Sequence, residues 1–186
     1  MRKNLSFLTK IPLAIASFTA LFGVLAFASA DFLSVGRLVQ GTPFDGRMRS
    51  AGCFNLMPNK FVLENRRSIE ELFAVARSFR YVGDLDGDSW QSAEETEARH
   101  AGDCEDKAIW LFARLTQNGY YNVLLTVGWY RRFDERLHVW VVCSDKNGNV
   151  YLLDPSMQKR IWSLTAIDSG FYKPVYAYDG TNKYQY

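Results

Sequence analysis

The sequence predicts a domain of the α+β class, with helices in its first half and an antiparallel sheet in its second half. Two helical patterns, over residues 68–80 and 104–117, precede every strong strand pattern. Segments rich in Val, Leu, Thr and aromatic residues then follow between residues 121 and 154. Because the helices come before the strands and do not alternate with them, the α+β class is favoured.

The first 30 residues have the three-part pattern of a secretory signal peptide. The start is basic, residues 11–30 are apolar, and small residues stand at Ala28 and Ala30 before Asp31. This pattern predicts cleavage after Ala30 and an exported protein, either periplasmic or secreted. The apolar run also approaches the ~20 residues that span a membrane, so an uncleaved membrane anchor is the alternative.

Residues 31–186 have a length that suits a single domain, whose core we expect at about 68–178. The leader holds three basic residues and no acidic one, so 19 Lys and Arg remain against 20 Asp and Glu. A nearly neutral domain without a basic run gives no reason to expect a nucleic-acid partner. Contact with a membrane is expected only through the leader, if it stays uncleaved.

The lead-in to the domain is expected to be irregular. Glycine and proline interrupt residues 31–67, where we expect extended chain with one short strand or helix near residues 60–63. Ser68 and Glu71 then form the pattern of a capping box. Apolar residues at helical spacing extend the predicted helix to about Arg80.

A polar, turn-like stretch separates this helix from a second and stronger one. Residues 84–100 contain one short predicted helix, over 93–99. The second strong helix is expected to begin near Cys104, because the apolar residues that follow fall on one face. The pair Asn118-Gly119 predicts where this helix ends.

Three strands are predicted after the second helix. They cover residues 121–130, 136–143 and 149–154. The last two are joined by a five-residue turn that contains Asn-Gly, which predicts an antiparallel hairpin. The aromatic tail is expected to add one more strand, near residues 175–178.

Cys104, His138 and Asp154 are the predicted catalytic residues. A thiol at a helix N-terminus is favoured as the reactive thiolate, and the chain order Cys, His, Asp is that of a papain-like triad. A hairpin centred near residue 146 would place His138 opposite a residue close to Asp154. Each residue alone is more often structural, but the three together, in this order and spacing, favour catalysis.

An acyl-transfer site also needs donors for the oxyanion. The backbone N–H of Cys104, at the predicted helix start, is one candidate. The side chains of Trp90 and Gln91, in the turn upstream, are the other candidates. Packing in the core is the simpler interpretation of Trp90.

Four segments together resemble the transglutaminase-like superfamily, in particular the bacterial transglutaminase-like cysteine proteinases. They are Trp90-Gln91-Ser92-Ala93-Glu94-Glu95, Gly102-Asp103-Cys104-Glu105-Asp106-Lys107-Ala108, His138-Val139-Trp140-Val141 and Leu153-Asp154-Pro155-Ser156. The resemblance covers about residues 81–156, and Ala93 departs from it because relatives often have proline there. It implies a papain-like fold, in which the helix bearing the nucleophile packs on an antiparallel sheet. It also implies that Cys104 is the nucleophile, His138 the base and then the acid, and Asp154 the orienting carboxylate.

Two acidic clusters are candidate calcium sites, although the expected chemistry requires no cofactor. The first matches positions one, three, five and twelve of a calcium loop: Asp84, Asp86, Asp88 and Glu95. However, Ser89 replaces the glycine of that loop, and an ordinary turn is the alternative. The resemblance implies the second cluster, because some bacterial relatives bind calcium through the acids around the cysteine, here Asp103, Glu105 and Asp106. Capping of the helix start is the alternative role of those three.

The three cysteines, Cys53, Cys104 and Cys143, all follow the leader. An odd number in an exported protein points to one free thiol or to an intermolecular bond. A disulfide between Cys53 and Cys143 would leave Cys104 free to react. Three unpaired cysteines, two of them buried as small apolar residues, are the equally weighted alternative.

These observations predict an exported cysteine peptidase or amidase. It would cleave amide bonds of a protein or peptide through a thioester intermediate on Cys104. The same chemistry with an amine as acceptor would be protein-glutamine transamidation, which crosslinks proteins. A third hypothesis is an inert binding module on the same fold. The absence of a C-x-x-C motif argues against a redox protein.

Overall fold

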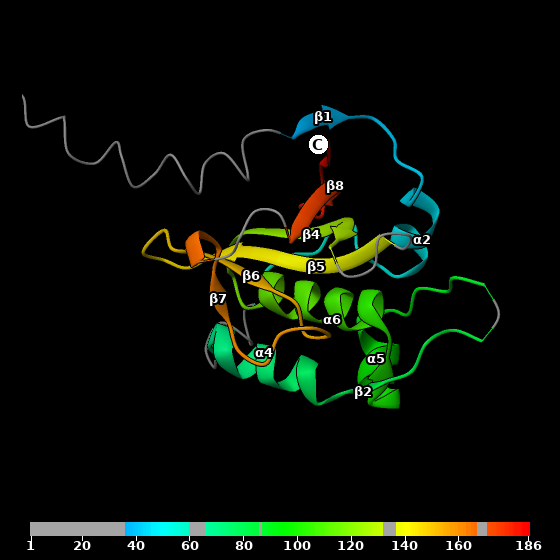
Figure 1. Ribbon diagram of the computed structural model, residues 1–186, viewed down its shortest axis with the longest axis horizontal. Coiled ribbons are helices and arrows are strands. Elements are labelled where there is room, and N and C mark those ends of the chain that lie inside the picture. The colour runs from blue at the N-terminus through cyan, green and yellow to red at the C-terminus, as the bar shows by residue number, and fades with distance from the viewer. Residues whose placement is uncertain (1–35, 60–65, 86, 132–136, 167–170) are drawn as a thin grey trace, which may run out of the picture.

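The computed structural model describes residues 36–59, 66–85, 87–131, 137–166 and 171–186. The leader, its expected cleavage site and the element expected near 60–63 lie outside the described residues. The α+β class is confirmed, because the described chain consists of helices packed on a mainly antiparallel sheet (Figure 1). In the described part of the chain, no helix combines the length and the apolar character needed to cross a membrane.

The three predicted helices are all present. They are α4 (Ile69–Ser78), α5 (Ala93–Arg99) and α6 (Cys104–Gln117). The predicted capping box at the start of α4 is confirmed, with the Ser68 hydroxyl accepting from the Glu71 N–H. This helix ends before the expected Arg80, because that residue enters a short parallel pair of strands, β2 (Arg80–Tyr81) with β3 (Ala101–Gly102).

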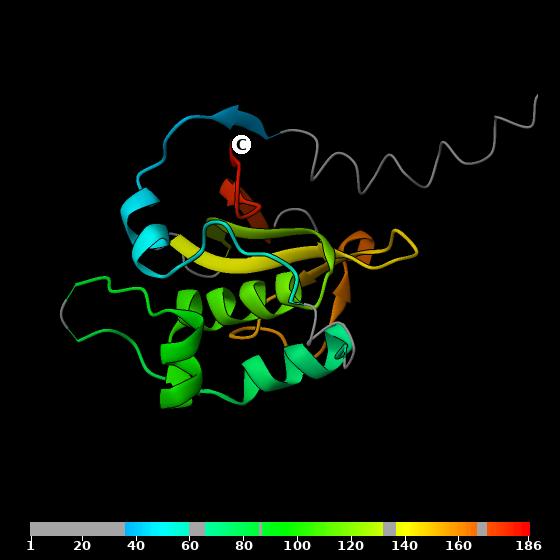
Figure 2. The same cartoon turned by 180° about the vertical axis from the view of Figure 1, so that it is seen from behind.

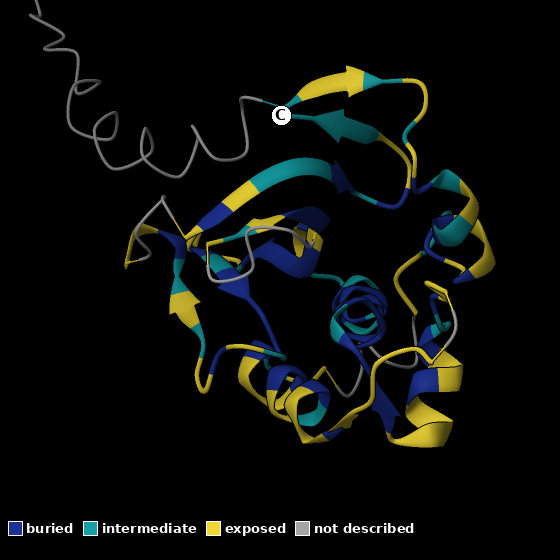
Figure 3. Cartoon of the chain, turned by 45° about the vertical axis from the view of Figure 1, so that its right-hand side comes forward, coloured by how far each residue is buried: buried dark blue, intermediate teal, exposed yellow. Residues whose placement is uncertain are grey.

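Helix α6 lies at the centre of the domain. Figures 1 and 2 show it between the sheet on one side and helices α4 and α5 on the other. Figure 3 looks nearly along its axis and shows a helix buried on most of its circumference. It ends at Asn118, followed by Gly119 with a φ of 70°, as the Asn-Gly signal predicts. The predicted nucleophile therefore stands at the first position of the most buried helix.

The main sheet has seven strands, in the order β1-β9-β8-β4-β5-β6-β7. Their bounds are β1 (Arg37–Val39), β4 (Tyr121–Tyr130), β5 (Leu137–Ser144), β6 (Val150–Leu153), β7 (Trp162–Ser163), β8 (Tyr172–Tyr178) and β9 (Lys183–Gln185). Every pair of neighbours in this sheet is antiparallel. The strand predicted in the tail is longer than expected, because β8 pairs with β4 from Tyr172 onwards.

The predicted β5–β6 hairpin is confirmed, but its register differs from the expected one. Val141 lies opposite Leu153, which centres the hairpin on residue 147 instead of 146. Continuing this register beyond β6 places Asp154 level with Trp140, two residues from His138. The two predicted catalytic side chains are therefore diagonal neighbours on the hairpin, a spacing that long side chains can bridge.

The lead-in is more ordered than the sequence predicts. It contains β1, which pairs with β9, and a short helix, α2 (Asp45–Ser50). The buried side chain of Met48 ties α2 to the hydrophobic core. A six-residue helix has little intrinsic stability in isolation, so tertiary packing and not local pattern determines it. A short 3₁₀ helix over Leu164–Ala166 was likewise not anticipated.

Gly128 lies opposite His138 in the β4–β5 pair, where there is no space for a side chain. A Cβ at this position would lie 2.1 Å from the backbone carbonyl oxygen of Lys173 and 2.7 Å from the ring of Trp140. We expect Gly128→Ala to lower the free energy of unfolding by about 1–3 kcal/mol, because β4 would have to move away from β8. Urea unfolding measures this change. Gly46→Ala is the control, since no atom lies within 4 Å of its added Cβ, and an equal effect of the two substitutions would contradict the explanation.

Candidate active site

Cys104 is the first residue of α6, directly after its N-cap residue Asp103. The glycine before them is a steric requirement. A Cβ on Gly102 would lie 2.5 Å from the Cβ of Asp106, which is one turn into the helix. Backbone N–H groups at a helix start favour negative charge, so this position favours the thiolate.

His138 and Asp154 form a buried pair. His138 Nε2 lies 2.7 Å from Asp154 Oδ2, and the aspartate is completely inaccessible to solvent. Oδ2 also accepts from the hydroxyl of Tyr172 at 3.0 Å. Oδ1 accepts from the backbone N–H groups of Ser156 and Met157, both at 3.0 Å. Four hydrogen bonds thus fix the carboxylate that orients the imidazole.

The cysteine sulfur lies against the strand that carries the histidine. The backbone N–H of Val139 lies close enough to Cys104 Sγ to lower the pKa of the thiol, against the larger effect of burial. Val139 follows His138 directly in β5, so the sulfur lies beside the backbone of the residue next to the histidine. The structure therefore pairs His138 of β5 with Asp154 from the loop after β6, and it places the Cys104 thiol of α6 near the backbone next to His138.

The thiol has acidic neighbours. Its Sγ donates to Glu105 Oε2 at 3.1 Å. Burial raises the pKa of the Cys104 thiol above its ordinary value, and the charges of Glu105 and Asp103 raise it further. Burial, with the neighbouring Asp103, also raises the pKa of Glu105 to about 9. Without a compensating positive charge, burial and these two carboxylates oppose formation of the thiolate.

One group of carboxylates close to the thiol fits a metal ion. One oxygen from each of Asp84, Asp88 and Glu105 lies within 4.8 Å of the others. Oδ1 of Asp103, which is also buried, has no hydrogen-bond partner. Calcium takes six to eight oxygen ligands, so an orphaned buried oxygen beside converging carboxylates suits this ion. Arg47 already forms an ion pair with Asp88 at 2.9 Å and would share that carboxylate.

The metal-ligand sets expected from the sequence are only partly brought together. Glu95 is used as a cap, because its carboxylate accepts from the Ser92 N–H at 2.8 Å. Asp106 accepts from the backbone N–H of Gln91 at 2.8 Å and also from its side-chain amide. Asp86 lies outside the described residues. The observed group instead combines one member of the expected acidic cluster around Cys104 with two members of the upstream loop.

The side chains expected to bind the oxyanion are engaged elsewhere. The indole N–H of Trp90 donates to Asp88 Oδ1 at 2.8 Å, and the amide of Gln91 donates to Asp106. Trp90 is also stacked on Phe44, which agrees with the packing role considered above. The backbone N–H of Cys104 stays the predicted donor.

Sequence reasoning missed Tyr172 at this site, and it placed Tyr130 only among aromatic residues that suit either a peptide groove or a core. Tyr172 binds Asp154 through its hydroxyl, and the ring of Tyr130 lies 5.7 Å from the ring of His138. Both residues belong to aromatic segments that also suit a core. Only the pairing of β4 with β8, which no local pattern encodes, reveals their position.

The disulfide considered between Cys53 and Cys143 is not formed. All three cysteines are free thiols, and these two are buried. Both of these cysteines belong to the hydrophobic core of the domain. Burial raises the pKa of each of these two thiols to about 12, which keeps both protonated at neutral pH.

The sequence matches no family model and no curated protein, but the structure is similar to Legionella pneumophila LapG. One LapG structure is 21% identical, with a TM-score of 0.55, over 68% of this chain and 71% of LapG. An EGTA-treated LapG is 19% identical, with a TM-score of 0.57, over 68% and 73%. A calcium-bound LapG is 20% identical, with a TM-score of 0.56, over 67% and 74%. The chain therefore has the papain- and transglutaminase-like α+β fold, which the LapG structures share.

Proposed function

We propose that this protein is an exported cysteine peptidase or amidase that cleaves amide bonds of a protein or peptide. Two observations support the proposal: the buried His138–Asp154 pair, and a Cys104 thiol at the start of α6 that lies near the backbone of Val139, the residue after His138. A binding module has no need of a thiol, an imidazole and an anchored carboxylate at one place. Export rests on the basic, apolar and small-residue pattern of the first 30 residues.

The arrangement can perform acyl transfer in two stages. Since Nε2 of His138 is bonded to Asp154, Nδ1 is the nitrogen that takes the thiol proton. The Cys104 sulfur attacks the amide carbonyl, and the backbone N–H of Cys104 stabilises the oxyanion. His138 returns the proton to the leaving amine, which departs and leaves a thioester. Water, activated by the same imidazole, then hydrolyses the thioester and restores the thiol.

Hydrolysis and transamidation share the first stage and differ in the acceptor. Incubation with a labelled primary amine and a glutamine-containing protein distinguishes them. We expect peptide cleavage without incorporation of the amine. Efficient incorporation would instead support the crosslinking alternative. Absence of both reactions, together with a Cys104 that electrophilic peptides do not modify, would favour the inert binding module.

We further propose that calcium binds beside the thiol. Asp84, Asp88 and Glu105 would hold it, together with the orphaned oxygen of Asp103. Bound calcium would supply positive charge that offsets the negative charge around the sulfur. LapG has been solved in both a calcium-bound and an EGTA-treated form, which supports a test of this site.

Calcium is expected to raise the melting temperature of the protein. At a calcium concentration of 100 times the dissociation constant, binding to the folded state adds about 2.7 kcal/mol. For a domain of this size the melting temperature then rises by roughly 5–10 °C, and excess chelator reverses the shift. The double variant Asp84→Asn/Asp88→Asn should lose the response. Glu94→Gln, which alters an exposed carboxylate outside the group, should retain it, and no shift in the unaltered protein would exclude the site.

In the presence of chelator, the free energy of unfolding is expected to fall as the pH rises from 6.5 to 9. Glu105 has a pKa of about 9 in the folded protein and an ordinary value of 4.5. Between these values the folded state binds more protons than the unfolded state, so stability is highest at low pH and decreases through this window. The pKa of Asp106, about 6, lies below the window. Urea unfolding across this range should show a flatter profile for Glu105→Gln, and an unchanged profile would contradict the assignment.

A further inference from the structure

An open cavity of about 550 Å³ lies near the His138–Asp154 pair. Two of its lining residues also contact the pair. Tyr172 donates its hydroxyl to Asp154, and the ring of Tyr130 lies 5.7 Å from that of His138. The volume falls within the range of about 300–1,000 Å³ that is typical of ligand pockets. A group bound here would thus contact the two tyrosines that flank the His138–Asp154 pair.

The outer wall of the cavity is apolar and accessible. Met157, Trp162 and Phe171 line it and are 38%, 40% and 36% exposed, respectively. These three belong to different parts of the chain, namely the loop after β6, strand β7 and the residue before β8. Large apolar side chains that gather around one concavity, while they remain exposed, indicate a surface that is covered when a ligand binds.

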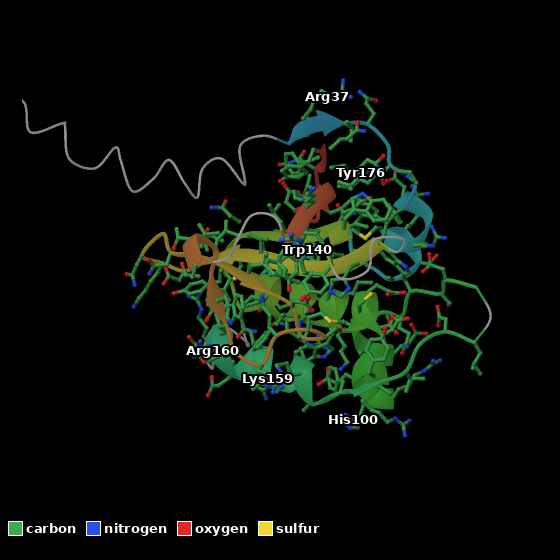
Figure 4. All side chains as sticks on the ribbon, viewed as in Figure 1. Arg37, His100, Trp140, Lys159, Arg160 and Tyr176 are labelled. Carbon is green, nitrogen blue, oxygen red and sulfur yellow. The ribbon has the colours of Figure 1, made fainter. Side chains whose placement is uncertain are left out.

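The same cavity has a positively charged border. Lys159 and Arg160 line it from the segment between β6 and β7, where Figure 4 shows both near α4. The guanidinium of Arg131 lies 5.6 Å from the centre of the Phe171 ring. None of the ion pairs among the described residues involves these three cations, and no described acidic side chain lines the cavity. His100, the other histidine, is exposed and does not line the cavity.

We propose that this cavity is the specificity pocket of the peptidase. It binds one aromatic or large aliphatic side chain of the substrate, and the cations at its border select an acidic residue next to that side chain. The proposal rests on the proposed peptidase function and specifies its substrate class. The backbone carbonyl of Lys159 accepts from Arg77 of α4 at 2.9 Å, which holds the cationic segment in place before any substrate binds.

The first experiment is a cleavage profile of the full chain on a library of mixed peptides, read by mass spectrometry. We expect Phe, Tyr, Trp or Leu within two residues of the cleaved bond, with Asp or Glu adjacent. Replacing the apolar residue of the best peptide by Ala should lower kcat/KM about tenfold or more. A profile without preference for apolar or acidic residues would overturn the proposal.

Variants then test the pocket itself. Lys159→Glu/Arg160→Glu should lower the preference for an acidic over a matched basic peptide by about tenfold. Lys146→Glu, a charge reversal on the exposed turn of the β5–β6 hairpin, is the matched control and should leave the preference unchanged. Trp162→Ala should raise KM about tenfold for the aromatic peptide, with little change in kcat. Unchanged preference in the double variant would contradict the assignment.

A binding measurement separates failure of this proposal from failure of the proposed function. The Cys104→Ser protein is titrated with the same acidic and basic aromatic peptides, and tryptophan fluorescence reports binding without turnover. Tighter binding of the acidic peptide, by about threefold or more, supports the pocket even if no peptide is cleaved. Equal binding overturns the pocket. A stable dimer of the full chain that peptide does not dissociate would overturn it as well, because a second copy would then fill the cavity.

Discussion

Replacing Cys104 by serine is expected to abolish amide cleavage, lowering kcat/KM by about 10⁴-fold or more. Serine has nearly the same shape, so the start of α6 and the contact with β5 should persist. The hydroxyl, however, is a far weaker nucleophile than a thiolate, and the proposed mechanism uses His138 to activate a thiol. Steady-state kinetics on a cleaved peptide measure the loss, and the melting temperature should stay close to that of the unaltered protein.

The other two cysteines provide controls for this prediction. Cys53 and Cys143 are 1% and 0% exposed, so Cys53→Ala and Cys143→Ala should reduce stability and leave the chemistry intact. An electrophilic peptide probe followed by mass mapping should modify Cys104 alone. Modification of either buried cysteine, or retained activity in Cys104→Ser, would show that the nucleophile lies elsewhere.

The probe should react faster in calcium than in chelator. Without calcium, burial and the neighbouring carboxylates of Glu105 and Asp103 raise the pKa of the Cys104 thiol. A cation held by Glu105 and the upstream aspartates would remove part of that opposition. The acidic sequence around the cysteine is therefore consistent with a nucleophile that reacts poorly until its neighbours are neutralised.

Local patterns were sufficient to predict the helices that position the nucleophile. The capping box at Ser68 agrees with the observed start of α4, and the pair Asn118-Gly119 agrees with the observed end of α6. Such signals work because orphan backbone groups at helix ends must be satisfied by nearby residues. The position of Cys104 at the start of α6 could therefore be read from sequence alone.

Register was predictable only approximately. The Asn-Gly turn indicated the hairpin but not its centre, which the structure places one residue further on. Asp154 reaches His138 because it lies just past β6, where the Ser156 and Met157 N–H groups hold its other oxygen. A turn after a strand can adopt several backbone conformations, and the sequence does not specify which one forms.

Contacts between distant segments could not be predicted. The acidic group joins Glu105 to Asp84 and Asp88, because bonds from Gln91 to Asp106 draw the upstream loop against α6. Tyr172 reaches Asp154 only because β8 lies beside β4. Neither arrangement leaves a periodic signal, since each depends on packing between segments far apart in the sequence.

Asp154→Asn is expected to lower kcat/KM by about 10⁴-fold while the protein remains folded. If the amide oxygen keeps the two backbone donors now bound to Oδ1, the amide NH₂ replaces Oδ2 and faces His138. Nε2 of His138 would then have to accept a hydrogen bond from this NH₂, which moves the imidazole proton to Nδ1. Nδ1 is the nitrogen that should take the thiol proton, so the imidazole could no longer act as the base. An asparagine at the orienting position of a serine protease triad has an effect of this size for the same reason.

Asp154→Ala should be more damaging to stability, because it leaves several donors without an acceptor in a dry interior. The imidazole of His138, the hydroxyl of Tyr172 and two backbone N–H groups all lose their partner. Removing one member of a buried pair costs about 3–5 kcal/mol, which lowers the melting temperature by roughly 10 °C or more. Asp145→Asn is the matched control, since Asp145 organises the turn of the same hairpin at its other end. If Asp145→Asn reduced activity as much as Asp154→Asn, the loss would reflect general damage to the hairpin and not the orientation of His138.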